Sequence, residues 1–136
     1  MKKLRLTLVL PLSIIALAVF RVRWYVKPFD ARDSYLYGFP FPSLAEAWHT
    51  SGAYQVFLLE FILNFLFYVV CFRLMVALIE RYLFRIQVPK FIPVVLWVIS
   101  ACILIFSSFL LIQSNNLYYL YRPFSMELVS VDLLGI

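Results

Sequence analysis

Long apolar runs alternate with polar segments along the 136-residue chain. Three of these runs cover about residues 6–26, 54–79 and 91–113. A helix needs roughly 20 residues to cross the hydrocarbon core of a bilayer. The second and third runs reach that length, and the first does so when Arg21 and Arg23 extend to the headgroups. The pattern therefore predicts an all-α membrane protein with three transmembrane helices.

Two polar stretches connect the apolar runs. The link around residues 87–90 is short, so the second and third helices are predicted to form an antiparallel hairpin. The outer loop, residues 27–53, is longer. Within this loop, Ser43 and Glu46 have the spacing of a capping box, which predicts a short interfacial helix over residues 44–50.

The C-terminal tail, residues 114–136, completes what we interpret as a single membrane domain of residues 1–136. Aromatic side chains with a polar atom suit the headgroup layer. Four such residues are predicted interfacial anchors: Trp48, Tyr118, Tyr119 and Tyr121. Residues 126–136 alternate apolar and polar positions briefly, which would allow them to add a strand to a partner's sheet. So short a pattern agrees better with a tail that is disordered or adsorbed to the membrane surface.

The composition agrees with a membrane environment. Apolar residues make up 65% of the chain and charged residues 14%, against roughly 25% charged residues in soluble domains. The net charge of +5 is spread in ones and twos, so no nucleic-acid-binding face is predicted. The predicted partners are the lipid bilayer and other membrane protein subunits. Cys71 and Cys102 lie inside apolar runs, so no cofactor, metal site or disulfide is predicted.

The basic residues indicate an orientation. Slightly more lysines and arginines flank the predicted helices on the side of the N-terminus, which favours an N-terminus inside and a C-terminus outside. We therefore expect a multi-pass protein of the bacterial cytoplasmic (inner) membrane. Residues 16–18 read Ala-Leu-Ala, the form of a signal-peptide cleavage site. Pro11 and the basic residues after this site favour an uncleaved anchor, and cleavage stays an alternative.

Glu60 and Asn64 lie inside the second apolar run, where polar side chains are costly. On a helix that turns about 100° per residue, Asn64 lies about 40° from Glu60, and Phe67 and Cys71 continue the same face. Steps of three and four residues are the spacing by which helices pack in membranes. The seam therefore predicts contact with a partner helix.

Ser107 and Ser108 lie level with Glu60 in the antiparallel third run, within reach of a hydrogen bond to its carboxylate. Such contacts contribute about 0.6 kcal/mol on average, whereas a charge at mid-membrane costs at least about 2.5 kcal/mol. One serine therefore does not offset the cost. We expect Glu60 to be protonated or to meet a cation, supplied by Arg21 or Arg23 or by another subunit.

These features predict a non-catalytic accessory or scaffold subunit of a larger membrane protein complex, which packs through the polar seam of the second run. The alternative is a small homo-oligomeric protein that conducts ions or protons along Glu60 and Asn64. The seam turns apolar beyond Asn64, which favours the accessory role. An enzyme is not expected, because the outer loop lacks a constellation of acids, histidines and basic phosphate-binding residues.

Residues 37–42 read Tyr-Gly-Phe-Pro-Phe-Pro and follow a short first run flanked by basic residues. In this stretch the chain loosely resembles small uncharacterised bacterial inner-membrane proteins with a Tyr-Gly-Phe-Pro-type loop. The resemblance covers this loop alone and implies no activity. No functional residue is transferred from it.

Overall fold

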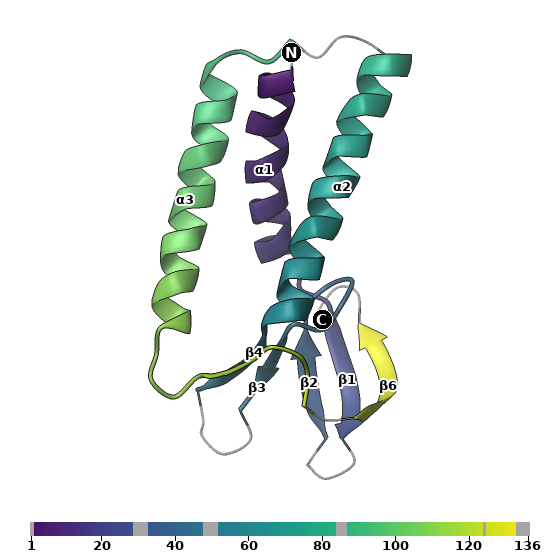
Figure 1. Cartoon of the computed structure of the whole chain (residues 1–136), viewed down its shortest axis with the longest axis vertical. Helices are drawn as coiled ribbons and strands as arrows, with labels where there is room; N and C mark the ends of the chain where they lie inside the picture. Colours follow the sequence, from purple (N-terminus) through teal and green to yellow (C-terminus); the bar gives the residue numbers. More distant parts are fainter. Residues whose placement is uncertain (1, 29–32, 48–51, 84–86, 124, 133–136) are drawn as a thin grey trace.

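The computed structural model describes residues 2–28, 33–47, 52–83, 87–123 and 125–132. Within this part of the chain, three helices stand above a β-sheet (Figure 1). The helices are α1 (Lys2–Val19), α2 (Leu58–Tyr82) and α3 (Phe91–Leu111). The strands are β1 (Arg23–Pro28), β2 (Ser34–Tyr37), β3 (Leu44–Glu46), β4 (Tyr54–Phe57), β5 (Leu117–Tyr119) and β6 (Met126–Asp132).

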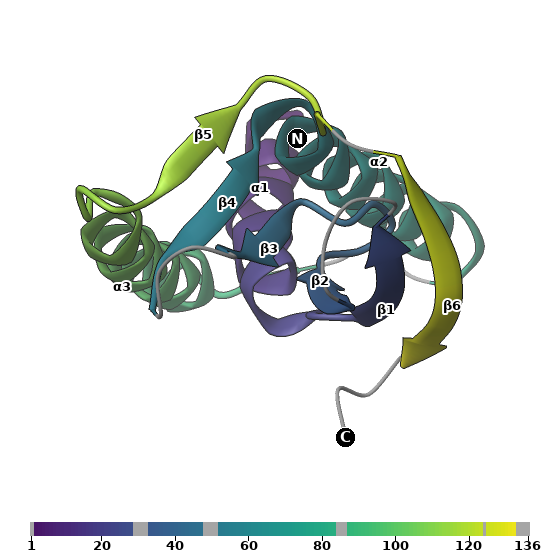
Figure 2. The ribbon, with the colours of Figure 1, turned by 90° about the horizontal axis from the view of Figure 1, so that it is seen from below.

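The six strands form one sheet in the order β5-β4-β3-β2-β1-β6. Neighbouring strands are antiparallel except β4 and β5, which are parallel. Seen from below, β5 lies on the α3 side of the molecule and β6 on the α2 side (Figure 2). β5 and β6 therefore form opposite edges of the sheet.

The prediction of an all-α protein is wrong, because the polar segments and the ends of the apolar runs form this sheet. The first run is helical only to Val19, and Arg23 then begins β1. Within residues 23–28, Trp24 and Val26 lie on one face, and the charged Arg23 and Lys27 lie on the other, which is the period of a strand. Backbone pairing with β2 and β6 stabilises that conformation.

The prediction of three transmembrane helices is also corrected. Among the described residues, α2 and α3 are long and apolar enough to cross a membrane by length and composition, whereas the apolar part of α1 covers only Leu6–Val19. The second run begins with β4, so α2 starts at Leu58 rather than at residue 54. α2 and α3 run antiparallel (Figure 1) but do not pack as a direct hairpin, because α1 contacts both of them.

The predicted interfacial helix is wrong where the structure describes it. Leu44–Glu46 is strand β3, which pairs with β2 on one side and β4 on the other. Two ladders satisfy this backbone, and the small Ala45 is fully buried between them, so long-range pairing overrides the local capping-box signal. Trp48, the predicted anchor of that helix, lies outside the described residues.

The tail also joins the sheet. β6 forms the longest pairing of the sheet, with β1, rather than being disordered, adsorbed to a membrane or added to another protein's sheet. β5 extends the opposite edge beside β4. Both edges of the described sheet are therefore formed by segments that follow α3 in the sequence.

The helices contact one another through small and polar side chains. The Ser100 hydroxyl of α3 donates a hydrogen bond to the Pro11 carbonyl of α1 at 3.1 Å, and the Trp97 indole Nε1 donates to the Thr7 carbonyl at 3.1 Å. Ser13 and Ser100 are fully buried. Small residues allow close approach of helix backbones, as in helix pairs within membranes.

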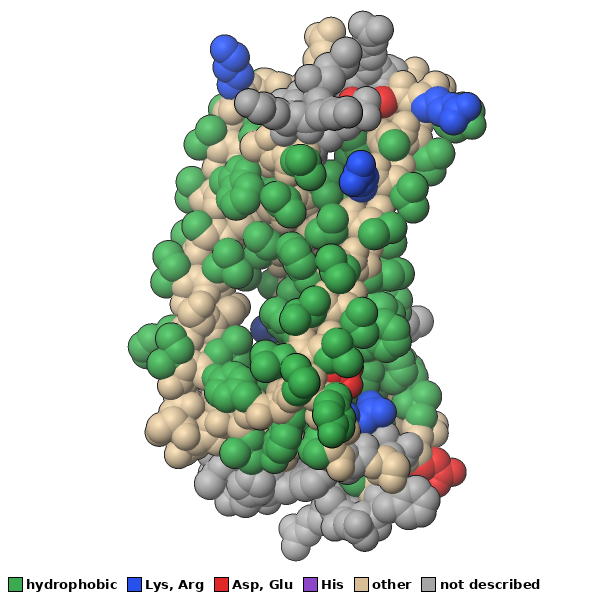
Figure 3. Space-filling model, viewed as in Figure 1, with side chains coloured by type: hydrophobic (Ala, Val, Ile, Leu, Met, Phe, Trp, Pro, Cys, Tyr) green, Lys and Arg blue, Asp and Glu red, His purple; other side chains and the backbone are tan. Residues whose placement is uncertain are grey.

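Large apolar side chains of α2 and α3 point outward. In the most apolar stretch of each helix, 11% of the residues of α2 and 6% of those of α3 are buried. Figure 3 shows hydrophobic side chains over the whole helical part of the visible face. Continuous apolar exposure of this extent is typical of a membrane or protein contact surface.

Candidate functional site

The end of the helices that meets the sheet contains most of the buried polar contacts that join distant segments. Asn64, fully buried on α2, donates from Nδ2 to the Phe41 carbonyl at 2.7 Å. Its Oδ1 accepts a hydrogen bond from the Phe41 amide at 2.9 Å. A single amide side chain therefore satisfies both backbone groups of one loop residue, and it fixes that loop against α2.

The loop between β2 and β3 is shaped to make this contact. Gly38 has φ +139°, and a Cβ there would lie 2.4 Å from the Phe41 carbonyl oxygen, so only glycine fits. The Phe39 ring then meets the Phe67 ring of α2 edge to face, with centroids 5.9 Å apart. This part of the predicted outer loop thus folds back onto the first turns of α2.

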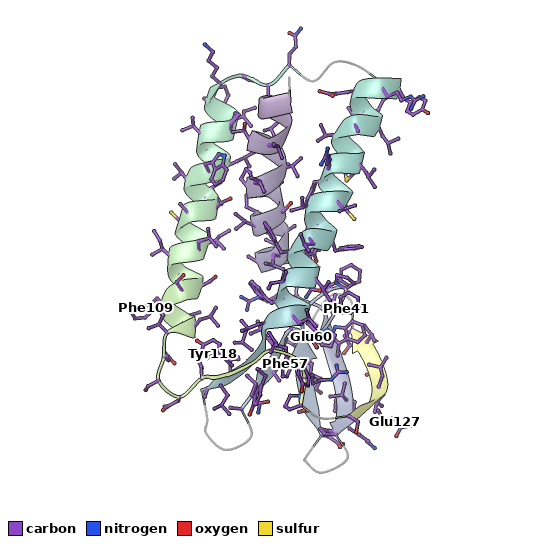
Figure 4. All side chains as sticks on the ribbon, viewed as in Figure 1. Phe41, Phe57, Glu60, Phe109, Tyr118 and Glu127 are labelled. Atoms are coloured by element: carbon purple, nitrogen blue, oxygen red, sulfur yellow. The ribbon has the colours of Figure 1, made fainter. Side chains whose placement is uncertain are left out.

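Glu60 lies in the first turn of α2, at the sheet end of the helix, close to Phe57 (Figure 4). The positive end of the helix dipole favours a carboxylate at this position. The Oε2 atom is buried and has no hydrogen-bond partner among the described residues. Since α2 begins only at Leu58, Glu60 is at the boundary of the helical region rather than deep within it.

The members of the predicted seam have different contacts and different exposure in the structure. Asn64 binds the loop, Phe67 is partly exposed beside Phe39, and Cys71 is half-buried. Ser107 lines a cavity described below, whereas Ser108 is exposed. Within the described residues no hydrogen bond connects Glu60 to either serine, and contact of this seam with a second subunit stays a prediction.

Asn116 is a buried side chain whose role the sequence did not reveal. It donates from Nδ2 to the carbonyls of Leu110 and Leu111, at 2.9 and 3.0 Å, at the C-terminal end of α3. Its Oδ1 accepts from the Tyr54 amide of β4 at 2.9 Å. Asn116 therefore fixes the end of α3 to the sheet. An asparagine just after a long helix is the available signal, because its side chain can bond exposed carbonyls.

The predicted tyrosine anchors occupy different environments. The Tyr118 hydroxyl donates to the Leu111 carbonyl, and Tyr118 is otherwise exposed. The Tyr119 ring lies 6.4 Å from the Phe57 ring and packs on the sheet core. Tyr121 is exposed. Contact of these rings with a headgroup layer stays a prediction.

A cavity of about 170 Å³ lies where the end of α1, the sheet, α2 and the last turns of α3 meet. Figure 3 shows the surface hollowed between α2 and α3 at this level, with a basic side chain at the back of the hollow. We call it the junction cavity. Its apolar walls include Ile14 and Leu17 of α1, Phe61 of α2, Ile103, Leu104 and Leu110 of α3, and Leu44 and Val56 of the sheet.

Polar groups gather at the sheet side of the junction cavity. Among the described residues that line it, Arg21 carries the formal charge, and Tyr37, Tyr54 and Ser107 supply hydroxyls. The Tyr37 hydroxyl donates to the Glu46 carboxylate at 3.2 Å. Burial raises the pKa of Tyr37 above its usual value, the Glu46 carboxylate raises this pKa further, and the nearby Arg23 opposes the rise.

The comparisons with known proteins found no relative of this chain. No protein-family model matches the sequence, and no curated protein or solved structure matches it. Among the described residues no three His, Cys, Asp or Glu side chains are grouped in a way that could hold a metal ion.

Proposed function

We propose that the protein is a non-catalytic accessory subunit of a membrane protein complex. In this proposal α2 and α3 cross the bacterial cytoplasmic membrane, and the sheet lies at its outer surface. The start of α1, the end of α2 and the start of α3 are at the opposite, inner end (Figure 1). The proposal depends on one observation in particular, which is the apolar surface of β6.

The outward faces of α2 and α3 support the membrane position. Ile105 of α3 is 71% exposed, and Val94, Phe106 and Phe109 are exposed to a similar degree. Lipid tails would cover such side chains with no loss of apolar contact. The polar seam residue Asn64, by contrast, is used inside the molecule.

Strand β6 supports a protein partner, because lipid tails would not reach an apolar surface in the sheet. Leu128 is 50% exposed and Val129 49%, and Val131 is also exposed. β6 is the last strand of the sheet, so no described strand pairs with its outer edge. Exposed apolar edge strands are an aggregation hazard unless something covers them. β6 lies on the α2 side of the molecule, so one partner would contact both.

The use of buried polar groups supports a structural role. Asn64, Asn116, Ser13 and Ser100 each bond a backbone carbonyl or amide of a neighbouring segment or turn. Side chains that are committed to backbone groups hold segments in place. They are not free to act as a nucleophile or a general base in this arrangement.

Blue-native electrophoresis of a mild-detergent extract from native membranes tests the proposal. We expect the wild-type chain to migrate in a complex that contains other proteins, identified by mass spectrometry of the band. Val129→Lys should shift the chain to its monomeric position, because the lysine places a charge in the proposed contact. The matched control, Leu120→Lys, changes an exposed leucine outside the strands and should leave the complex intact.

Two results would overturn the accessory role. One is migration of the wild-type chain as a lone monomer, and the other is a band that contains only copies of this chain. The membrane position is tested separately: release of the wild-type chain by alkaline carbonate would contradict insertion of α2 and α3.

A further inference from the structure

The junction cavity contains a charge that the surrounding residues leave unneutralised. Arg21 lines it, directly after the end of α1, and no ion pair of Arg21 occurs among the described residues. Arg23 is nearby on β1, where it is paired in register with Tyr37. Glu46 is the acid on this side and is hydrogen-bonded to Tyr37. Asp132 of β6 lies opposite Arg23 in register, so Arg21 is the unbalanced charge of the described cavity lining.

The apolar part of the cavity matches a hydrocarbon chain. A dry apolar cavity of roughly 150 Å³ accommodates a benzene-sized molecule, so about 170 Å³ accommodates a short stretch of an acyl chain. Ser107 lies four residues before the end of α3, which is about 6 Å along the helix axis. In the proposed membrane position this depth is just below the headgroups, where the upper part of an acyl chain lies.

We propose that the junction cavity binds one anionic phospholipid, with its phosphate at Arg21 and the upper part of one acyl chain between α1, α2 and α3. Guanidinium groups bind phosphate through paired hydrogen bonds. A zwitterionic lipid brings its own cation next to the phosphate, and the positive charge of Arg21 then disfavours it. The inference rests on the membrane position proposed above but requires no partner subunit.

Native mass spectrometry of the purified full-length protein in mild detergent tests this inference. The probes are phosphatidylglycerol and phosphatidylcholine with identical acyl chains, each titrated against the protein. We expect one phosphatidylglycerol to be retained with about tenfold higher affinity than phosphatidylcholine. Arg21→Gln should abolish this preference, and Arg21→Lys should restore part of it because the charge is kept.

Matched variants separate a built site from general attraction. Arg73→Gln removes an exposed arginine of α2 that does not line the cavity, and it should leave the preference unchanged. Ser107→Phe should fill the cavity and lower the retention of phosphatidylglycerol about tenfold. Ser108→Phe, on the exposed neighbouring position, should not. Circular dichroism confirms that each variant is folded.

The inference is overturned if the wild type binds both lipids equally, if Arg21→Gln and Arg73→Gln lower binding to the same extent, or if folded Ser107→Phe binds like the wild type. These outcomes are distinguishable from failure of the membrane position. A protein that stays in the membrane in alkaline carbonate but shows no lipid preference contradicts the lipid site alone.

Discussion

The helical region and the sheet region of this protein are built in opposite ways. In the helices, the buried side chains include the polar Ser13, Asn64 and Ser100, and large apolar side chains face outward. In the sheet, the buried cluster is apolar and includes Val26 and Phe57, while charged side chains of β1 and β6 are exposed. This contrast agrees with the proposed membrane position, in which lipid surrounds the helices and water surrounds most of the sheet.

This contrast shows what burial contributes in each region. In the sheet, removal of apolar side chains from water stabilises the fold. In α2 and α3, most large apolar side chains remain exposed, so close packing against α1 and hydrogen bonds such as that from Ser100 to Pro11 contribute to holding the helices together. The predictions below test whether the two regions respond as differently as their construction implies.

Truncation of one large side chain in each region should give the largest difference. Phe57→Ala removes a fully buried ring from the sheet core and should lower the free energy of unfolding by about 3–5 kcal/mol. Ile105→Ala, on the outward face of α3, should lower it by less than about 1 kcal/mol, because detergent or lipid fills the space. Denaturant unfolding in mild detergent measures both values. Equal losses of unfolding free energy in the two variants would mean that the two regions share one environment.

Asn64→Leu should have the second largest effect. The leucine leaves the amide and the carbonyl of Phe41 without their partner, at about 1–3 kcal/mol for each buried group. We expect a loss of about 2–4 kcal/mol by the same unfolding measurement. The control Leu63→Ala changes an exposed side chain one residue away and should cost little. A small loss for Asn64→Leu would show that the contact does not hold the loop.

The helices could be predicted from sequence because their signal is local. An apolar run of about 20 residues has few alternatives, and α3 at Phe91–Leu111 lies inside the predicted run of residues 91–113. Asn64 was also recognisable as unusual, since an amide among apolar residues is rare. Its partner was not, because the loop that contains Phe41 is brought to α2 by the sheet.

The sheet could not be predicted because its pairings are distant in sequence and its strands are short. Arg23 pairs with Asp132 near the other end of the chain, and no local pattern indicates that contact. Arg21, just before β1, and Arg23, its first residue, were interpreted as a helix end that extends to headgroups, although they alternate with apolar residues. β4 is a four-residue strand that continues directly into α2, and a short apolar strand cannot be distinguished from helix by its pattern.

Cysteine labelling tests the two surroundings directly. In a background with Cys71→Ala and Cys102→Ala, Ser130→Cys on β6 should react with a membrane-impermeant maleimide in whole spheroplasts, because position 130 is exposed at the proposed outer surface. Ile105→Cys should react at least about tenfold more slowly, because an apolar environment suppresses the reactive thiolate. Solubilisation in detergent should reduce the difference in labelling rate between Ser130→Cys and Ile105→Cys.

A cysteine at the proposed inner end of α3 is the control for the orientation in the membrane. Lys90→Cys, at the start of α3, should be labelled only after the membrane is permeabilised. Labelling of Lys90→Cys but not Ser130→Cys in intact spheroplasts would reverse the proposed orientation. Rapid labelling of Ile105→Cys in intact membranes would contradict a lipid-facing α3.

Alkaline pH should weaken the sheet region slightly. Burial, followed by the Glu46 carboxylate, raises the pKa of Tyr37 in the folded protein, so folding favours the neutral hydroxyl. This contribution is complete below the unfolded pKa of about 10 and is lost as pH rises through the higher folded pKa. The effect is small because Tyr37 is only partly buried.

Between about pH 9 and pH 11 the thermal midpoint of Tyr37→Phe should fall less than that of the wild type. Tyr121→Phe, at an exposed position, should follow the wild type. If the thermal midpoints of all three proteins fall in parallel as the pH rises, folding does not change the pKa of Tyr37.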